Sequence, residues 1–465
     1  MPPSCTVLRR LQHLAGALPL AQPASAPHYS SGGRQPPKKG DGRVVFGSHP
    51  LPADPAETHL PHMVNGGRFD YGYPMADKAP ATEVKIVPVA SADAFSADAL
   101  VVVAAFGSGA GFSSTPWAFL DALLDTATAV DQRVRRSAVL TPIAPDQSTG
   151  APAGVQRLVA CPVSLLDYDG ADIRGYADAA LAGMRIAVAA GAQRPLLVVQ
   201  AHNGAASAAS CVYTAAIAAA EAFYVPLEAR EDSAVKAGAA PGALLTVTVG
   251  LASAAASPDA ALSASTLAQG ATEATATNAG LSLARDLCGG SPERHTPLRV
   301  ATSVQRAFEG SGVAVEVIQG KHRLEQDYPL LAAVDRGSVP RHAGCVIKLT
   351  YRPDAAGGGE AVATTGHHIL VGKGVAMDTG GVNLKSNGGG GMARDKGGAA
   401  AVAGLMLAVS RLRPPSTAFS AYLCMVRNSI GSDGAYAWHA WHCLHCLPTL
   451  CSLACHSGVL VCVSS

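Results

Sequence analysis

The chain has 465 residues, a net charge of +1 and 48% hydrophobic residues, and only 15% of its residues are charged. This composition is typical of globular proteins and excludes a collagen or a disordered chain, and the length suits two or three domains. The near-zero net charge gives no electrostatic reason to expect a nucleic acid or an anionic membrane as partner. No uncharged apolar run is long enough to predict a membrane helix.

Residues 1–82 are expected to form a disordered or targeting extension. The first 40 residues contain no Asp or Glu, and four leucines recur at helical spacing between Leu8 and Leu18, beside Arg9 and Arg10. This pattern is typical of an organelle transit peptide, although an extension without targeting function and, less well, a secretory signal also fit it. The eleven Cys, mostly scattered singly, suit a reducing compartment. We expect a cytoplasmic location, with a mitochondrion or plastid as the alternative.

Strand-like and helix-like segments alternate over residues 83–258, which predicts a first α/β domain. The expected strands are Val84–Val89, Ala99–Ala104, Leu158–Val163 and Pro195–Gln200, with a helix over Tyr176–Ala190. Residues 251–282 consist largely of Ala, Ser and Thr and are expected to form a helix-prone connector between domains.

The alternation resumes over residues 259–432, which predicts a second, larger α/β domain. The expected strands are Val313–Ile318, Cys345–Thr350, His368–Val371 and Ala418–Val426. A helix over Ala399–Arg413 is expected to end at Pro414 and Pro415. His367 and His368 are interpreted as exposed residues at a strand start. The predicted fold class is α/β with two domains.

The segment from Val371 to Ala400 combines charged residues with many glycines. A buried strand is expected to end at Lys373, and Asp395 is expected just before a helix. The segment lacks the G-x-x-x-x-G-K-[ST] pattern of a phosphate-binding loop. A glycine-rich turn with solvated charges is one interpretation. The other is a site for a hard cation, with oxygen ligands from Asp378 and Asp395.

The local charges favour that site only in part. The two carboxylates are accompanied by four basic residues, which are Lys373, Lys385, Arg394 and Lys396. A pair of divalent cations would therefore need further acids from elsewhere in the chain.

The residues from Val371 to Lys385 match the pattern V-G-K-G-x-x-x-D-[ST]-G-G-x-x-x-K at every fixed position. This segment resembles the catalytic core of the leucyl aminopeptidase (M17, cytosol aminopeptidase) family, closest to its probable-aminopeptidase branch. Thr296-Pro297 and Tyr328–Val334 resemble the start of the same domain. The resemblance implies a metallo-aminopeptidase that removes N-terminal residues from peptide substrates and assembles as a homo-oligomer, a hexamer in the family.

The resemblance also implies roles for individual residues. Lys373, Asp378 and Asp395 would be metal ligands, and Lys385 would polarise the scissile carbonyl. Met392 would line the substrate pocket, although plain core packing explains it equally well. Two divalent ions, Mn²⁺ or Zn²⁺, would activate the attacking water.

One departure from the family concerns the second motif, N-T-D-A-E-G-R, which does not occur in the chain. The resemblance is expected to end near Asp433, so that the catalytic domain over residues 259–432 is C-terminally truncated and its turnover impaired. The alternative function is a catalytically inactive, aminopeptidase-like binding or regulatory subunit.

Residues 433–465 are expected to form a non-homologous tail rich in Cys, His and Trp. Residues 434–465 contain no Asp, Glu, Lys or Arg. The tail is interpreted as foreign to the preceding domain, with zinc binding as an alternative. The residues of zinc-ligand type are His439, His442, Cys443, His445, Cys446, Cys451 and Cys455.

Overall fold

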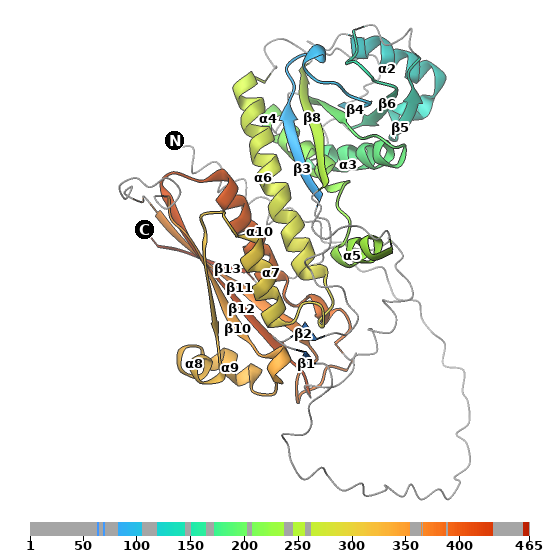
Figure 1. Ribbon diagram of the computed structural model, residues 1–465. Coiled ribbons are helices and arrows are strands. Elements are labelled where there is room, and N and C mark those ends of the chain that lie inside the picture. Colours follow the sequence, from blue (N-terminus) through green and yellow to red (C-terminus); the bar gives the residue numbers. More distant parts are fainter. Residues whose placement is uncertain are drawn as a thin grey trace, which may run out of the picture.

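The described part of the chain forms one two-stranded sheet and two large sheets with helices (Figure 1). The computed structural model describes residues 63–64, 68–69, 82–104, 119–144, 150–163, 172–201, 207–236, 245–255, 262–353, 364, 366–386, 389–430 and 459–464. The two-stranded sheet pairs β1 (Met63–Val64) with β2 (Arg68–Phe69).

The first large sheet has six strands in the order β3-β8-β7-β4-β6-β5. Its strands are β3 (Thr82–Pro88), β4 (Ala99–Ala104), β5 (Val139–Pro142), β6 (Arg157–Pro162), β7 (Pro195–Ala201) and β8 (Leu245–Ala255). The neighbouring pairs are parallel except for β5 with β6. Its helices are α2 (Phe119–Val130), α3 (Arg174–Ala189), α4 (Ala208–Glu221) and α5 (Leu227–Lys236).

The core of this sheet lies on both of its faces. Every residue of the central strands β4 and β7 is buried, which explains why both sequences are nearly continuous apolar runs, interrupted only by Gln200, rather than alternating ones. Side chains of α3 and α4 pack on one face, and side chains of α2 pack on the other. Short 3-10 helices, η2 (Ala92–Ala94) and η3 (Gln132–Arg135), lie in the connections.

The second large sheet has five strands in the order β13-β11-β12-β10-β9. Its strands are β9 (Ala314–Gln319), β10 (Cys345–Tyr351), β11 (Gly366–Asp378), β12 (Thr417–Asn428) and β13 (Val459–Ser464). Only β11 and β12 pair in parallel among them. The helical elements are α7 (Pro297–Ala307), α8 (Lys321–Asp327), α9 (Pro329–Asp335), η6 (Pro340–His342), η8 (Met392–Arg394) and α10 (Gly397–Leu412).

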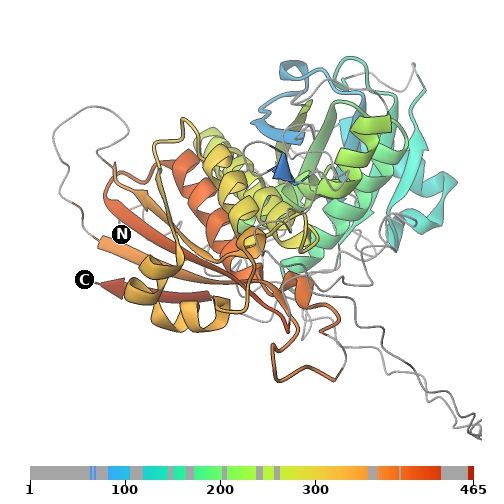
Figure 2. The same ribbon diagram turned by 60° about the horizontal axis from the view of Figure 1, so that its bottom comes forward.

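The long helix α6 (Ala264–Gly289) runs between the two large sheets, as both views show (Figures 1 and 2). Its Thr275 hydroxyl accepts a hydrogen bond from Ile86 N of β3 at 3.0 Å. Helix α6 also packs closely on α10, where Gly280 lies against Gly404. A Cβ at Gly404 would lie 2.4 Å from Gly280 O, so the two helix backbones touch directly. Helix α10 is thereby fixed immediately after Asp395.

The predicted two-domain α/β architecture is confirmed, and so are the ten individual strands and helices predicted within a few residues, except for one strand end. Two of the secondary-structure expectations were wrong. Residues 251–255 belong to β8, because pairing with β3 and β7 overrides the helix propensity of alanine. The strand expected to end at Lys373 continues to Asp378, because β11 keeps pairing with β12 as far as Asn428.

His367 and His368 do lie at the start of β11, but neither is exposed as expected; both are half-buried. His367 Nε2 lies 2.9 Å from Ser420 Oγ, and the His368 ring lies 5.2 Å from the Phe419 ring. The neighbouring strand β12 supplies both partners, which a single sequence segment does not reveal.

Other expectations fall largely outside the described residues. One of these is most of the expected extension over residues 1–82, because the structure describes nothing before residue 63. Another is the group of metal-ligand candidates in the tail, because the only described part of the tail is the strand β13. The predicted domain boundary at residues 258 and 259 stays a prediction. None of the described helices has both the length and the apolar character that crossing a membrane requires.

Candidate functional site

The predicted residues Lys373 and Asp395 form an ion pair. Lys373 extends from β11, and its Nζ lies 3.1 Å from Asp395 Oδ2. Asp395 lies between η8 and the first turn of α10, where its backbone carbonyl accepts a hydrogen bond from Val375 N at 3.2 Å. The Lys373 side chain is half exposed, whereas the Asp395 carboxylate is mostly buried. Solvent and a ligand can therefore approach the pair from the lysine side.

A second ion pair joins Asp378 and Lys385, with 2.9 Å between Oδ2 and Nζ. The other carboxylate oxygen of Asp378, Oδ1, accepts hydrogen bonds from Gly380 N at 2.9 Å and from Asn428 Nδ2 at 2.8 Å. Burial raises the pKa of Asp378, but the donors Lys385, Gly380 and Asn428 together outweigh it, and the pKa lies below its usual value. The hydrogen bond to Asp378 raises the pKa of the Lys385 ammonium.

The two ion pairs lie next to each other. The negative charge of Asp395 also contributes to the raised pKa of Lys385, although Asp378 is its direct partner. Met392 joins the group, because Lys385 Nζ lies 3.7 Å from its sulfur and the Met392 side chain is half-buried. All five residues predicted from the sequence are thus brought together around the carboxyl-terminal part of β11, the strand on which Lys373 and Asp378 lie.

Two glycines shape the turn between Asp378 and Lys385. Gly380 and Gly381 have φ angles of 91° and 61°, in the left-handed region that favours glycine. A Cβ at Gly380 would lie 2.3 Å from Asn383 O. The turn is closed by a hydrogen bond from Lys385 N to Thr379 O at 2.9 Å, and it returns Lys385 to the carboxylate of Asp378.

Lys396 is one of the four basic residues that accompany the two carboxylates in the sequence, but its side chain does not reach them. Its side chain is buried, and its Nζ donates to Gly290 O at 2.9 Å and to Ala393 O at 2.6 Å. Burial lowers the pKa of this amine to about 8. Because Lys396 donates to two backbone carbonyls, it does not pair with Asp378 or Asp395. Those two carboxylates pair with Lys385 and Lys373 instead.

Asn428 is the functional candidate that the sequence interpretation missed. It lies at the last residue of β12 and donates directly to Asp378. The available signal was weak: an Asn that follows the predicted strand Ala418–Val426 after one intervening residue lies near a sheet edge where sites form.

Among the described residues, no group of three or more His, Cys, Asp and Glu side chains is close enough to hold a metal ion. A cation at Asp378 and Asp395 would therefore need a third ligand of another type. Lys373 can supply one as a neutral amine.

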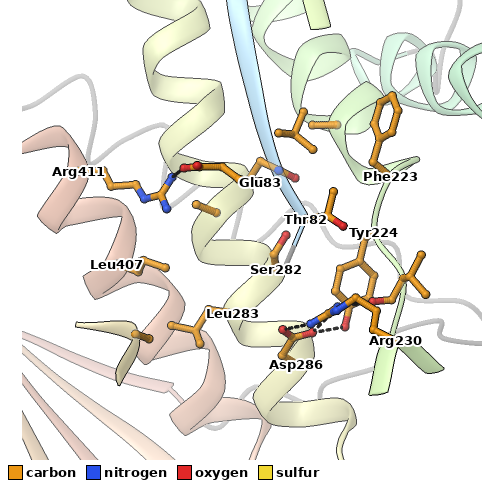
Figure 3. Close-up of a pocket in the computed structure, with 16 residues that line it drawn as sticks. Thr82, Glu83, Phe223, Tyr224, Arg230, Ser282, Leu283, Asp286, Leu407 and Arg411 are labelled. Carbon is orange, nitrogen blue, oxygen red and sulfur yellow. Dashed lines mark hydrogen bonds and ion pairs between the residues drawn. The ribbon is translucent and has the colours of Figure 1, made fainter. Parts of the chain in front are cut away.

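A cavity of about 290 Å³ lies between the two large sheets and is separate from these residues. Figure 3 shows its two ion pairs, Arg411 with Glu83 and Arg230 with Asp286. The residues that line it come mainly from β3, the end of α4, α6 and α10, and none is among the five predicted site residues. The cavity and the group of predicted site residues are therefore two separate features of the described structure.

The fold and these residues define an α/β protein with paired lysines and aspartates at a sheet edge. Residues 282–437 match the cytosol aminopeptidase family, catalytic domain. The resemblance to the leucyl aminopeptidase family is therefore confirmed over this part of the chain. The match ends at residue 437, a few residues beyond the expected end of the resemblance near Asp433.

Curated relatives agree with this match. A Caenorhabditis elegans protein named "Putative aminopeptidase W07G4.4" is 35% identical over 269 residues, covering 57% of this chain and 46% of the relative. A "Probable cytosol aminopeptidase" of Aeropyrum pernix is 38% identical over 135 residues, covering 29% of this chain and 25% of the relative. The chain thus spans less than half the length of either relative.

Solved structures show the same fold. A leucyl aminopeptidase from Trypanosoma brucei in complex with bestatin matches with a TM-score of 0.52 and 21% identity, over 77% of this chain and 64% of that one. A tomato leucine aminopeptidase mutant matches with a TM-score of 0.52 and 16% identity, over 77% and 65% of the two chains.

Proposed function

We propose that this chain is a metal-dependent aminopeptidase that removes N-terminal residues from peptides. The observation that carries the proposal is the meeting of Lys373, Asp378, Lys385 and Asp395 in two adjacent ion pairs. Lys373, Asp378 and Lys385 occupy the fixed lysine and aspartate positions of a motif that resembles the family's catalytic core, and Asp395 follows this motif. The family match over residues 282–437 supports the same function.

The residues present fit one divalent cation. Asp395 Oδ2 is buried and accepts no hydrogen bond within the described structure; Lys373 Nζ lies 3.1 Å from it. A buried carboxylate oxygen in this state favours a positive partner. Two carboxylates and a neutral Lys373 amine together carry a charge of −2, which balances one divalent cation. Their donor set of hard oxygens with one nitrogen suits Mn²⁺ or Zn²⁺.

Each residue then has a distinct role. Lys373, Asp378 and Asp395 hold the cation, which when bound supplies Lewis-acid activation. The Lys385 ammonium donates a hydrogen bond to the carbonyl oxygen of the scissile peptide bond and stabilises the charge that develops there. Met392 lies beside Lys385 and offers an apolar contact to the first side chain of the substrate.

A second cation would need more acid groups. The described residues place two carboxylates at this site, and the N-T-D-A-E-G-R motif does not occur in the sequence. We therefore propose that a second cation binds only if acidic groups other than Asp378 and Asp395 are supplied to the site. Without them, we propose that turnover by this chain is slow.

The proposal is tested by hydrolysis of a leucyl chromogenic amide with Mn²⁺ present. We expect release that depends on the metal and that stops when the α-amine is acetylated, because an exopeptidase needs the free amine. If the rate with protein equals the rate without protein, both in the presence and in the absence of Mn²⁺, the proposal is contradicted. The alternative of a catalytically inactive binding or regulatory subunit would then stand.

We also propose that the chain assembles as a homo-oligomer, as a hexamer by family, and works in the cytoplasm. Light scattering coupled to gel filtration measures the assembly, and a monomer at micromolar concentration would contradict it. Imaging of the chain with a C-terminal fluorescent tag measures the location. Removal of residues 1–40 then separates cytoplasmic residence from organelle import.

A further inference from the structure

An irregular register in the second large sheet places Asp378 opposite Asn428. Along β11 and β12, Val375 pairs with Val426, and the next pair is Asp378 with Asn428. Three steps on β11 thus correspond to two steps on β12, which is the pattern of a β-bulge. Such bulges re-aim a side chain and are common beside active sites. Without it, Asp378 would be one position out of register with Asn428.

Asn428 holds the segment after the bulge by hydrogen bonds to two successive residues, Asp378 and Thr379. Its side-chain Nδ2 donates to Asp378 Oδ1 at 2.8 Å. Its backbone carbonyl accepts from Thr379 N at 2.9 Å and from Thr379 Oγ1 at 3.1 Å. The Asn428 Oδ1 atom also lies against Gly381. A Cβ at Gly381 would lie 2.5 Å from this oxygen, so that only glycine fits there.

These contacts decide which carboxylate oxygen of Asp378 is available. Oδ1 is used by the neutral donors Gly380 N and Asn428 Nδ2, whereas Oδ2 meets the Lys385 ammonium. A carboxylate held through one oxygen cannot rotate freely. The second oxygen therefore keeps a fixed direction toward the space shared with Lys385.

Asn428 is itself anchored by a buried polar cluster, the Glu293–His342–Arg427 cluster. Arg427 Nη1 lies 2.7 Å from Glu293 Oε1 and 2.9 Å from His342 Nε2, and the Arg427 side chain is almost completely buried. Arg427 Nε also donates to Ser429 Oγ at 2.9 Å. The residues on both sides of Asn428 are thus fixed by side-chain hydrogen bonds.

We infer that Asn428 is a positioning residue that sets the orientation of the Asp378 carboxylate for cation binding. The inference rests on the proposed function and adds to it a residue that acts through Asp378. An amide is required at this position because it donates to Asp378 while remaining uncharged. A side chain without that N–H leaves the carboxylate held by Gly380 N and Lys385 alone.

The experiment is a calorimetric titration of the full chain with MnCl₂, arranged as a double-mutant cycle. The four proteins are wild type, Asp378→Asn, Asn428→Ala and the double variant. We expect Asn428→Ala to weaken Mn²⁺ binding about tenfold, and the double variant to bind no more weakly than Asp378→Asn. A general structural role would give additive losses, so additive losses or unchanged affinity in Asn428→Ala would overturn the inference.

Two further variants keep the result interpretable. Asn383→Ala makes the same substitution at an exposed position of the same turn, and we expect unchanged Mn²⁺ affinity. If Asn428→Ala does not fold, Asn428→Thr suits the strand but has a hydroxyl too short to replace the amide, and it should show the same loss. A wild-type chain that binds no Mn²⁺ would overturn the proposed function as well, whereas wild-type binding lost in Asp378→Asn but not in Asn428→Ala would overturn this inference alone.

Discussion

Lys385 Nζ lies 2.9 Å from Asp378 Oδ2, so a proposed catalytic lysine and a proposed metal ligand share one ion pair. The turn at Gly380 and Gly381 brings them together. The same carboxylate oxygen cannot serve the lysine and a cation equally well. Cation binding is therefore expected to release Lys385 toward the substrate.

This competition predicts opposite effects of Lys385→Ala on catalysis and on metal affinity. We expect the rate of leucyl amide hydrolysis to fall by about 10²–10³, the loss typical for one group that stabilises a developing oxyanion. Mn²⁺ affinity should stay the same or increase, because Asp378 loses a competing cation. Steady-state kinetics and calorimetry measure the two quantities.

Lys348→Ala is the control for that substitution, because Lys348 lies on β10 and pairs only loosely with Glu316, at 3.8 Å. We expect it to leave rate and affinity unchanged. A Lys385→Ala variant that keeps the wild-type rate would remove the catalytic role of this lysine.

The contact between α6 and α10 predicts that Gly404→Ala is destabilising. The added Cβ would lie 2.4 Å from Gly280 O, a backbone atom that cannot move aside alone. We expect a loss of about 1–3 kcal/mol in the free energy of unfolding, as for overpacked cores. Urea unfolding measures it.

Gly270→Ala in the facing helix α6 is the control, because a Cβ there meets no atom within 4 Å. Alanine is the better helix former by about 1 kcal/mol, so this variant should be slightly more stable than wild type. Equal effects of the two substitutions would show that the helices do not approach as described.

Glu293 predicts a pH-dependent contribution to stability. Burial raises its pKa, but hydrogen bonds and charges from His342 and Arg427 outweigh this and lower the pKa to about 2. A folded-state pKa below the unfolded value stabilises the protein above pH ~4.5, and this stabilisation is lost as the pH falls toward 2. The contribution is about 3 kcal/mol at neutral pH.

Glu293→Gln should therefore lower the free energy of unfolding at pH 7 by about that amount. The difference from wild type should shrink between pH 4.5 and pH 2. Urea unfolding across this range measures it, with the exposed Glu309→Gln as control. A difference that is independent of pH would be inconsistent with the lowered pKa.

Breaking two ion pairs that differ in burial is expected to lower the free energy of unfolding by very different amounts. The Arg294–Glu231 pair, at 2.6 Å, connects α5 to the segment after α6, and both side chains are 3% exposed. Glu231→Gln leaves the buried Arg294 charge without its partner and should cost about 3–5 kcal/mol. Glu83→Gln removes the partly exposed pair with Arg411 and should cost less than about 1 kcal/mol. Urea unfolding of both variants would contradict this ranking if the costs were similar.

Much of the fold was predictable because its signals are local. The strand at Ala99–Ala104 is an unbroken apolar run, and the strand at Pro195–Ala201 is apolar except for Gln200. The helix after Asp395 begins in a run of small residues and ends before two prolines. The strand at residues 251–255 was missed because its alanines become strand residues only through their neighbours in the sheet.

The candidate site was predictable where a contiguous motif carries it. Lys373, Asp378 and Lys385 lie within thirteen residues of one another, and Asp395 follows at a short interval. Asn428 was not predictable, because its contact with Asp378 depends on the pairing of β11 with β12 and on a bulge. The burial of Lys396 depends likewise on Gly290, more than a hundred residues away.

The most direct test of the account is anomalous X-ray scattering from crystals of the chain soaked in MnCl₂. The account predicts a manganese peak within ligand distance of both the Asp378 and the Asp395 carboxylates, and no such peak in Asp395→Asn crystals. Manganese found elsewhere, or no manganese with these side chains still paired to Lys373 and Lys385, would contradict the assignment of a cation site.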